Sequence, residues 1–140
     1  MINKDRVLKL LQDVKEWQRD FAVCLESLEM CGDEKLEKVI NHSIRAYFLD
    51  IHILFEDYIS IQLKILNRYK VDISAVEGME IIMNERIISE EFFSFYSYSR
   101  RLRNRLAHRY KMPTDDVLLD NLRNNSKYIN ELEEAIKNMI

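Results

Sequence analysis

From Lys4 to Cys31 the chain reads KDRVLKLLQDVKEWQRDFAVCLESLEMC, with apolar residues at alternating steps of three and four. The residues that follow this spacing are Val7, Leu10, Val14, Trp17, Phe21, Cys24, Leu28 and Cys31. Steps of three and four place side chains on one face of an α-helix. The stretch therefore predicts a long amphipathic helix over about residues 4–30, which Gly32 ends.

The rest of the chain continues the helical pattern. We expect a very long helix over about 34–69, a connection over 70–78, a short helix over about 79–88, a helix from Ser89 to about Tyr110, and a last helix from Thr114 to about Met139. Pro113 disfavours helix at the residue before it. The sequence therefore predicts an all-α fold, an up-and-down bundle of four long helices plus one short helix, in a single domain over 1–140.

The second helix is expected to carry an unusually broad apolar face. A helix of this kind packs on two neighbours, and another subunit can be one of them.

The composition places the chain among soluble globular proteins. Hydrophobic residues make up 47% of the 140 residues and charged residues 32%. No apolar run approaches the roughly 18 residues that cross a bilayer, and Lys4, Asp5 and Arg6 argue against a secretory leader. Cys24 and Cys31 fit reduced thiols. We therefore expect a cytoplasmic protein that does not contact membranes.

Positive charge is concentrated in one segment, although the net charge is −3. Between residues 100 and 111 there is no acid, and the cations are Arg100, Arg101, Arg103, Arg105, Arg109 and Lys111. A local basic patch can attract a polyanion without causing non-specific binding over the rest of the surface. We interpret Arg100, Arg101, Arg105, Arg109 and Lys111 as candidate RNA-binding residues.

The same segment carries the pattern R-N-x-x-x-H-x-Y, formed by Arg103, Asn104, His108 and Tyr110. On a straight helix Asn104 and His108 are nearly aligned, whereas Arg103 and His108 lie about 140° apart. Three arrangements would bring Arg103 and His108 together: an arginine side chain that wraps around the helix, a helix that loosens near its end, or a second subunit that contributes its own copy across a twofold axis. We favour the second subunit.

This pattern suits RNA cleavage, because RNA supplies its own nucleophile in the 2′-hydroxyl. Histidine can act as general base or acid, and arginine binds phosphate in a bidentate manner. Arg103 and His108 are therefore the candidate catalytic residues. Asn104 is expected to orient the imidazole through a hydrogen bond one turn along the helix, and Tyr110 to position a phosphate or the histidine.

The Arg103-Asn104-x-x-x-His108-x-Tyr110 string and the order of the helices resemble the HEPN-domain proteins of the HepT toxin group. The resemblance implies a homodimeric toxin of a toxin–antitoxin pair that cuts RNA without a metal or other cofactor. It also implies a nucleotidyltransferase antitoxin, which can neutralise the toxin by adding AMP to Tyr110.

Two other interpretations of the same residues remain open. The chain can be a non-catalytic module that binds a nucleotidyltransferase, which would need neither Arg103 nor His108. It can also be a plain helical adaptor, in which the basic segment is only a solvated face. His42 and His52 have no cysteine or histidine one turn away, so we interpret them as surface or packing residues and not as metal ligands.

Overall fold

The computed structural model describes residues 3–140, apart from the side chain of Arg109. The helices are α1 (Lys4–Glu29), α2 (Glu34–Ile65), α3 (Ala75–Asn84), α4 (Glu90–Arg105), α5 (Asp115–Arg123) and α6 (Ser126–Lys137), with a 3₁₀ turn, η1, at Arg109–Lys111. No strand occurs within these residues, which confirms the all-α class. No helix in the described part of the chain is long and apolar enough to cross a membrane.

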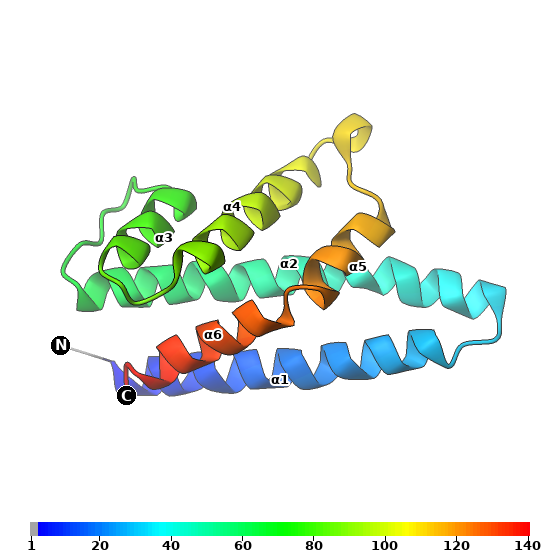
Figure 1. The fold of residues 1–140 in the computed structure, drawn as a ribbon, viewed down its shortest axis with the longest axis horizontal. Coiled ribbons are helices and arrows are strands. Elements are labelled where there is room, and N and C mark those ends of the chain that lie inside the picture. The colour runs from blue at the N-terminus through cyan, green and yellow to red at the C-terminus, as the bar shows by residue number, and fades with distance from the viewer. Residues whose placement is uncertain (1–2) are drawn as a thin grey trace.

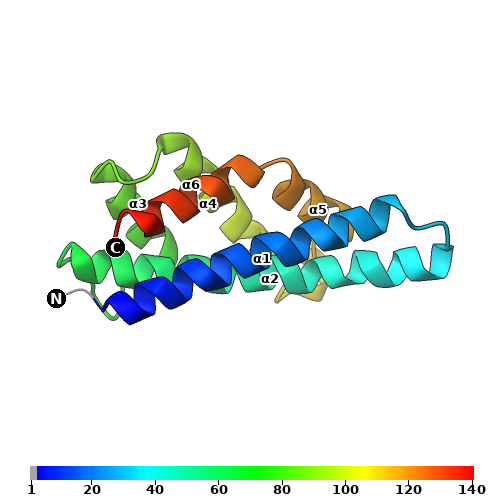
Figure 2. The same ribbon diagram turned by 90° about the horizontal axis from the view of Figure 1, so that it is seen from below.

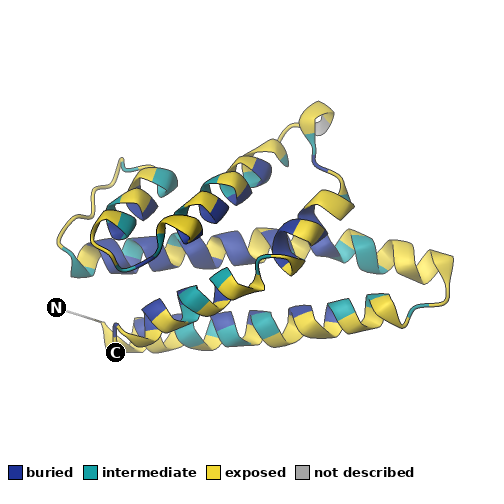
Figure 3. Cartoon of the chain, viewed as in Figure 1, coloured by how far each residue is buried: buried dark blue, intermediate teal, exposed yellow. Residues whose placement is uncertain are grey.

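The helices α1 and α2 form an antiparallel hairpin that runs the length of the molecule (Figure 1). Helices α3, α4 and α5 pack on α2, while α6 returns along α1. Figure 2, turned by 90°, shows α1 and α2 side by side as well. The loop end of this hairpin extends beyond the other helices and is largely exposed (Figure 3). Helix α4 is oblique to α2, so its carboxyl end and η1 project away from the hairpin (Figure 1).

Aromatic side chains from α2 and α4 fill the centre of the core. Phe55 and Tyr96 are fully buried and meet edge to face, with ring centroids 5.2 Å apart and planes at 84°. Phe92 packs on Phe55 in the same way, at 6.2 Å. Edge-to-face pairs stabilise the fold beyond the free energy gained by burial alone, because the positive edge of one ring meets the negative face of the other. This cluster fixes α4 on α2.

Local sequence sets the helix starts as expected at two positions. The Ser89 hydroxyl accepts a hydrogen bond from the Phe92 amide at 3.0 Å, and the Thr114 hydroxyl accepts one from the Val117 amide at 3.3 Å. Each bond satisfies an amide in the first turn that has no partner within the helix. The predicted starts of α4 and α5 are therefore confirmed.

The short helix α3 begins earlier than predicted, at Ala75 instead of about residue 79, because Ser74 caps it. Gly78, which we had expected in the connection, lies inside α3 against α2. A β-carbon at this position would come within 2.6 Å of Ile59 Cγ2 and 3.1 Å of Leu63 Cδ1. The glycine therefore allows the close approach of the two helices, which the sequence pattern alone does not reveal.

The prediction of a single carboxyl-terminal helix is wrong, since two helices, α5 and α6, occupy this region and bring the number of α-helices within residues 3–140 to six. The break falls at Asn124 and Asn125. Asparagine side chains compete with the backbone for helical hydrogen bonds. Here the side-chain nitrogen Nδ2 of Asn125 donates to the backbone carbonyl oxygen of Asn121 at 2.8 Å. The break redirects α6 onto α1.

Candidate functional site

The predicted motif straddles the end of α4. The helix ends at Arg105, five residues before the predicted end near Tyr110. The His108 amide then bonds to the Arg105 carbonyl oxygen at 3.0 Å, and Arg105 Nε donates to the Lys111 carbonyl oxygen at 3.0 Å. Pro113 is buried, so the chain must turn back toward the core before it. These contacts replace the last expected helical turn with a tight loop.

The four motif residues consequently lie in two kinds of backbone. Arg103 is half-buried on the last turn of α4, and Asn104 beside it is exposed. His108 is exposed beyond the helix, and Tyr110, in η1, has 82% of its surface accessible. The straight-helix angle between Arg103 and His108 therefore does not apply, because the helix has ended between them.

The loop brings His108 and Tyr110 together, with ring centroids 6.1 Å apart. The Lys111 ammonium lies 5.5 Å from the centroid of the Tyr110 ring. Among the described side chains, no hydrogen bond joins His108 to Asn104 or to Arg103. The expected Asn104–His108 bond is thus absent.

The remaining basic residues differ in their surroundings. Arg100 is not an unpaired cation, because it forms an ion pair with Glu56 of α2 and only 18% of its side chain is exposed. Arg101 is exposed, with its guanidinium 5.9 Å from the Tyr98 ring centroid. Arg105 and Lys111 are exposed at the loop. The side chain of Arg109 lies outside the described residues. The accessible basic edge consists of Arg101, Arg105 and Lys111, with Arg103 half-buried beside it.

A buried polar chain lies beneath the motif. His52 of α2 is 1% exposed, and its Nε2 is 2.7 Å from the Ser99 hydroxyl of α4. Ser99 in turn donates to Asn121 Oδ1 of α5 at 3.0 Å. The single proton of the Ser99 hydroxyl is donated to Asn121 Oδ1. The hydrogen bond between His52 and Ser99 therefore runs the other way, with the N–H of His52 Nε2 as donor and the Ser99 hydroxyl oxygen as acceptor. The three residues tie α2, α4 and α5 together one turn before Arg103.

His52 is held neutral in this position. Burial lowers its pKa to about 3, and the positive charges of Arg100 and Arg103 act in the same direction. Its Nδ1 is buried without a hydrogen-bond partner in the described part of the chain. We expected His52 to be either a surface or a packing residue, and its burial places it in the packing class, but its hydrogen-bond partners were not predicted. The available signal was Ser99, a polar residue within the apolar stripe of α4.

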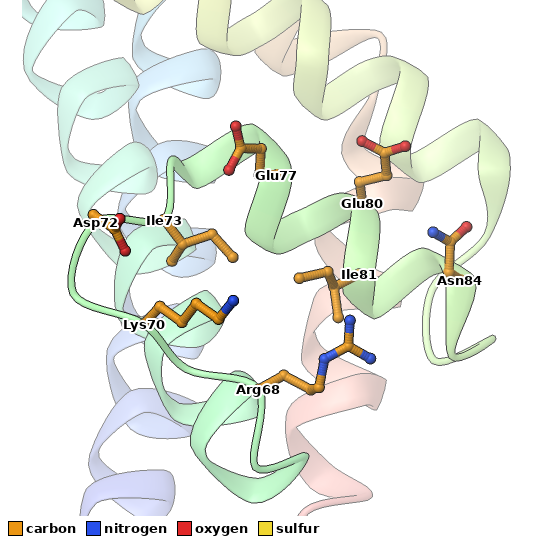
Figure 4. Close-up of a pocket in the computed structure, with 8 residues that line it drawn as sticks. All are labelled: Arg68, Lys70, Asp72, Ile73, Glu77, Glu80, Ile81 and Asn84. Carbon is orange, nitrogen blue, oxygen red and sulfur yellow. The ribbon is translucent and has the colours of Figure 1, made fainter.

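The structure has a separate hollow of about 430 Å³ at the other end of α2. It lies between α3 and the loop after α2, as Figure 4 shows. Its walls combine two cations, Arg68 and Lys70, with three carboxylates, of Asp72, Glu77 and Glu80. Mixed charge of this kind gives no net attraction for a phosphate. We therefore do not assign the polyanion site to this hollow.

Comparison of the chain with protein-family profiles, with curated proteins and with solved structures gave no match.

Proposed function

We propose that this protein is a HEPN-type, metal-independent endoribonuclease that acts as the toxin of a toxin–antitoxin pair. The observation that carries the proposal is the position of the motif: the helix ends between Arg103 and His108, and it leaves the imidazole exposed beside a basic edge. An exposed imidazole next to several cations suits RNA cleavage, in which cations hold the phosphodiester while the 2′-hydroxyl loses a proton and the leaving 5′-oxygen gains one.

In the proposed reaction, the 2′-hydroxyl oxygen of RNA attacks the adjacent phosphorus, and the bond to the 5′-oxygen breaks. His108 of one subunit accepts the 2′-hydroxyl proton, and His108 of the second subunit donates a proton to the leaving 5′-oxygen. Arg103 stabilises the negative charge that builds on the phosphorane oxygens. The products are a 2′,3′-cyclic phosphate and a 5′-hydroxyl.

The second subunit is part of the proposal, and an apolar strip on α2 supports it. Leu49 and Ile53 lie four residues apart and are 40% and 56% exposed. Arg45 and Glu56 flank them along the helix and contact Asp115 of α5 and Arg100 of α4. Exposed apolar side chains one turn apart on α2 are the kind of surface that a twofold contact between copies buries.

We expect Leu49→Asp with Ile53→Asp to convert a dimer into a monomer, because the contact would bury two carboxylates from each subunit. Light scattering of the purified chain measures the change in mass. Val23→Asp is the control, since Val23 is an apolar residue 61% exposed on α1 and not on α2. A wild-type chain that is monomeric at high micromolar concentration would contradict the dimer.

Tyr110 is the proposed point of neutralisation by a nucleotidyltransferase. Its large exposed fraction leaves the phenol accessible to another enzyme. In the proposed step, the phenol oxygen attacks the α-phosphorus of ATP, pyrophosphate leaves, and AMP remains on Tyr110. Intact mass measurement after coexpression with such an enzyme should show one added AMP, absent from Tyr110→Phe.

The test of the central proposal uses the purified full chain, labelled single-stranded RNA and EDTA. We expect cleavage in EDTA with cyclic phosphate ends, and no cleavage of the same oligonucleotide with 2′-O-methyl groups, because that substrate lacks the nucleophile. Intact RNA after incubation with the wild-type chain would favour the non-catalytic binding module.

A further inference from the structure

The loop that carries His108 and Tyr110 is fixed to the core at its two ends and is exposed between them. Leu106, at its start, is half-buried against the core, and Pro113, at its end, is buried. Between residues 107 and 111 the described side chains are all exposed. Burial therefore fixes where this segment begins and ends, but it does not fix the path of the segment that holds the candidate catalytic histidine.

Arg105 closes this segment with two hydrogen bonds. Its backbone carbonyl oxygen accepts from the His108 amide at 3.0 Å, and its side-chain Nε donates to the Lys111 carbonyl oxygen at 3.0 Å. The Lys111 amide also donates to the His108 carbonyl oxygen, at 2.9 Å. Among the described side chains, Arg105 is the only one that forms a hydrogen bond with residues 107–112. Both His108 and Tyr110 lie inside the ring that the Nε bond closes.

The Arg105 guanidinium has donors left after this bond. Arginine presents five N–H groups, and Nε carries one of them, so the terminal nitrogens keep the rest. No hydrogen bond or ion pair to these terminal nitrogens occurs in the described part of the chain, and the side chain is exposed. The same side chain can therefore hold the loop through Nε and present its terminal nitrogens to a phosphate.

We infer that Arg105 is a positioning residue, a clasp whose Nε–Lys111 hydrogen bond holds the loop in the shape that places His108 for proton transfer. General acid–base catalysis requires the imidazole to be within hydrogen-bond reach of the proton that it moves, and a displacement of about 1 Å can lower the rate by a large factor. An exposed segment samples more backbone conformations without such a bond. The inference rests on the proposed function, because it assigns the loop a role in RNA cleavage.

A pair of neutral variants separates the Nε bond from the charge of Arg105. In Arg105→Gln the side-chain nitrogen stands as many bonds from the backbone as arginine Nε, so it can donate to the same carbonyl oxygen. In Arg105→Met a methyl group takes that place and donates nothing. Both variants lack the positive charge, and Arg105 is exposed, so neither should disturb folding.

Backbone hydrogen exchange, measured by nuclear magnetic resonance on the full chain, tests the clasp without any RNA. We expect the His108 and Lys111 amides of Arg105→Met to exchange about fivefold faster than in the wild type, since an exposed hydrogen bond has been lost. The same amides of Arg105→Gln should exchange at the wild-type rate. Equal exchange rates in the two variants would overturn the clasp.

Cleavage of labelled single-stranded RNA gives the second readout. Both variants should raise KM, because both lose a cation that binds phosphate. Only Arg105→Met should also lower kcat, by about tenfold, because only that variant leaves His108 misplaced. Arg123→Met is the control, since Arg123 forms an exposed hydrogen bond with Asp120 within α5, at 3.2 Å. Its loss should change neither the exchange of the loop amides nor kcat.

The clasp and the nuclease can fail separately. If the wild-type chain cleaves RNA and the two variants share one kcat, the nuclease stands and the positioning role of Arg105 is wrong, even where the loop amides respond. If the loop amides respond as expected but the wild-type chain leaves RNA intact, the Nε bond orders the loop, and the role in cleavage falls with the nuclease.

Discussion

His108→Ala is expected to lower the rate of RNA cleavage by roughly 10²–10⁴-fold, the usual contribution of a general acid or base. Arg103→Ala should cause a loss of similar order, because phosphorane charge would be left without its bidentate partner. Arg103→Lys keeps the charge but not the bidentate geometry, so we expect only partial recovery. Initial rates on a labelled single-stranded RNA measure all three effects.

The structure supplies a control for this series. His42 is exposed on α2, so His42→Ala removes a histidine outside the motif. His108 is exposed as well, and its replacement should change stability by less than about 0.5 kcal/mol. Thermal unfolding of each variant shows whether a loss of cleavage activity comes from the missing side chain or from a loss of folded protein. Full cleavage activity in His108→Ala would rule out the mechanism proposed above.

Acidification is expected to destabilise the protein through His52. The histidine has an ordinary pKa of 6.5 when unfolded and about 3 when folded. Above pH 6.5 it is neutral in both states and contributes no pH dependence. Below pH 6.5 the unfolded chain gains a proton that the folded chain does not bind, so stability falls as pH falls toward 3. At pH 4.5 the loss is about 2–3 kcal/mol.

The contribution of His52 can be isolated from that of the carboxylates with His52→Gln. Glutamine keeps a nitrogen donor for Ser99 but does not titrate in this range. The free energy of unfolding, measured in urea from pH 7 to pH 4.5, should fall more steeply for the wild type than for this variant. His42→Gln should follow the wild type. Parallel curves for wild type and His52→Gln would show that His52 takes up a proton in the fold.

The long helices could be predicted because their information is local. The apolar spacing from Val7 to Cys24 is matched by burial of those side chains, and Ser89 and Thr114 cap the helices that they were expected to begin. Hydrophobic periodicity and capping depend only on neighbouring residues. The second long helix starts at Glu34 as expected, although it ends at Ile65 instead of about residue 69.

The remaining features depend on contacts between distant segments. Glu56 partners Arg100 across 44 positions in the sequence, so the motif region looked free of acids when only its own residues were considered. Gly78 belongs to a helix because Ile59 and Leu63 come close to it, and not because glycine favours helix. The early end of α4 follows from the burial of Pro113. None of these contacts leaves a periodic signal.

The end of α4 at Arg105 also separates two kinds of evolutionary constraint. Arg103 keeps the register of a helix packed on the core, and any insertion before it would rotate buried side chains such as Leu102 and Ser99 into solvent. His108 belongs to an exposed loop, where backbone length can change at small thermodynamic cost. An added or deleted residue between Arg105 and His108 would therefore leave the bundle stable, but it would shift the proposed catalytic imidazole relative to Arg103.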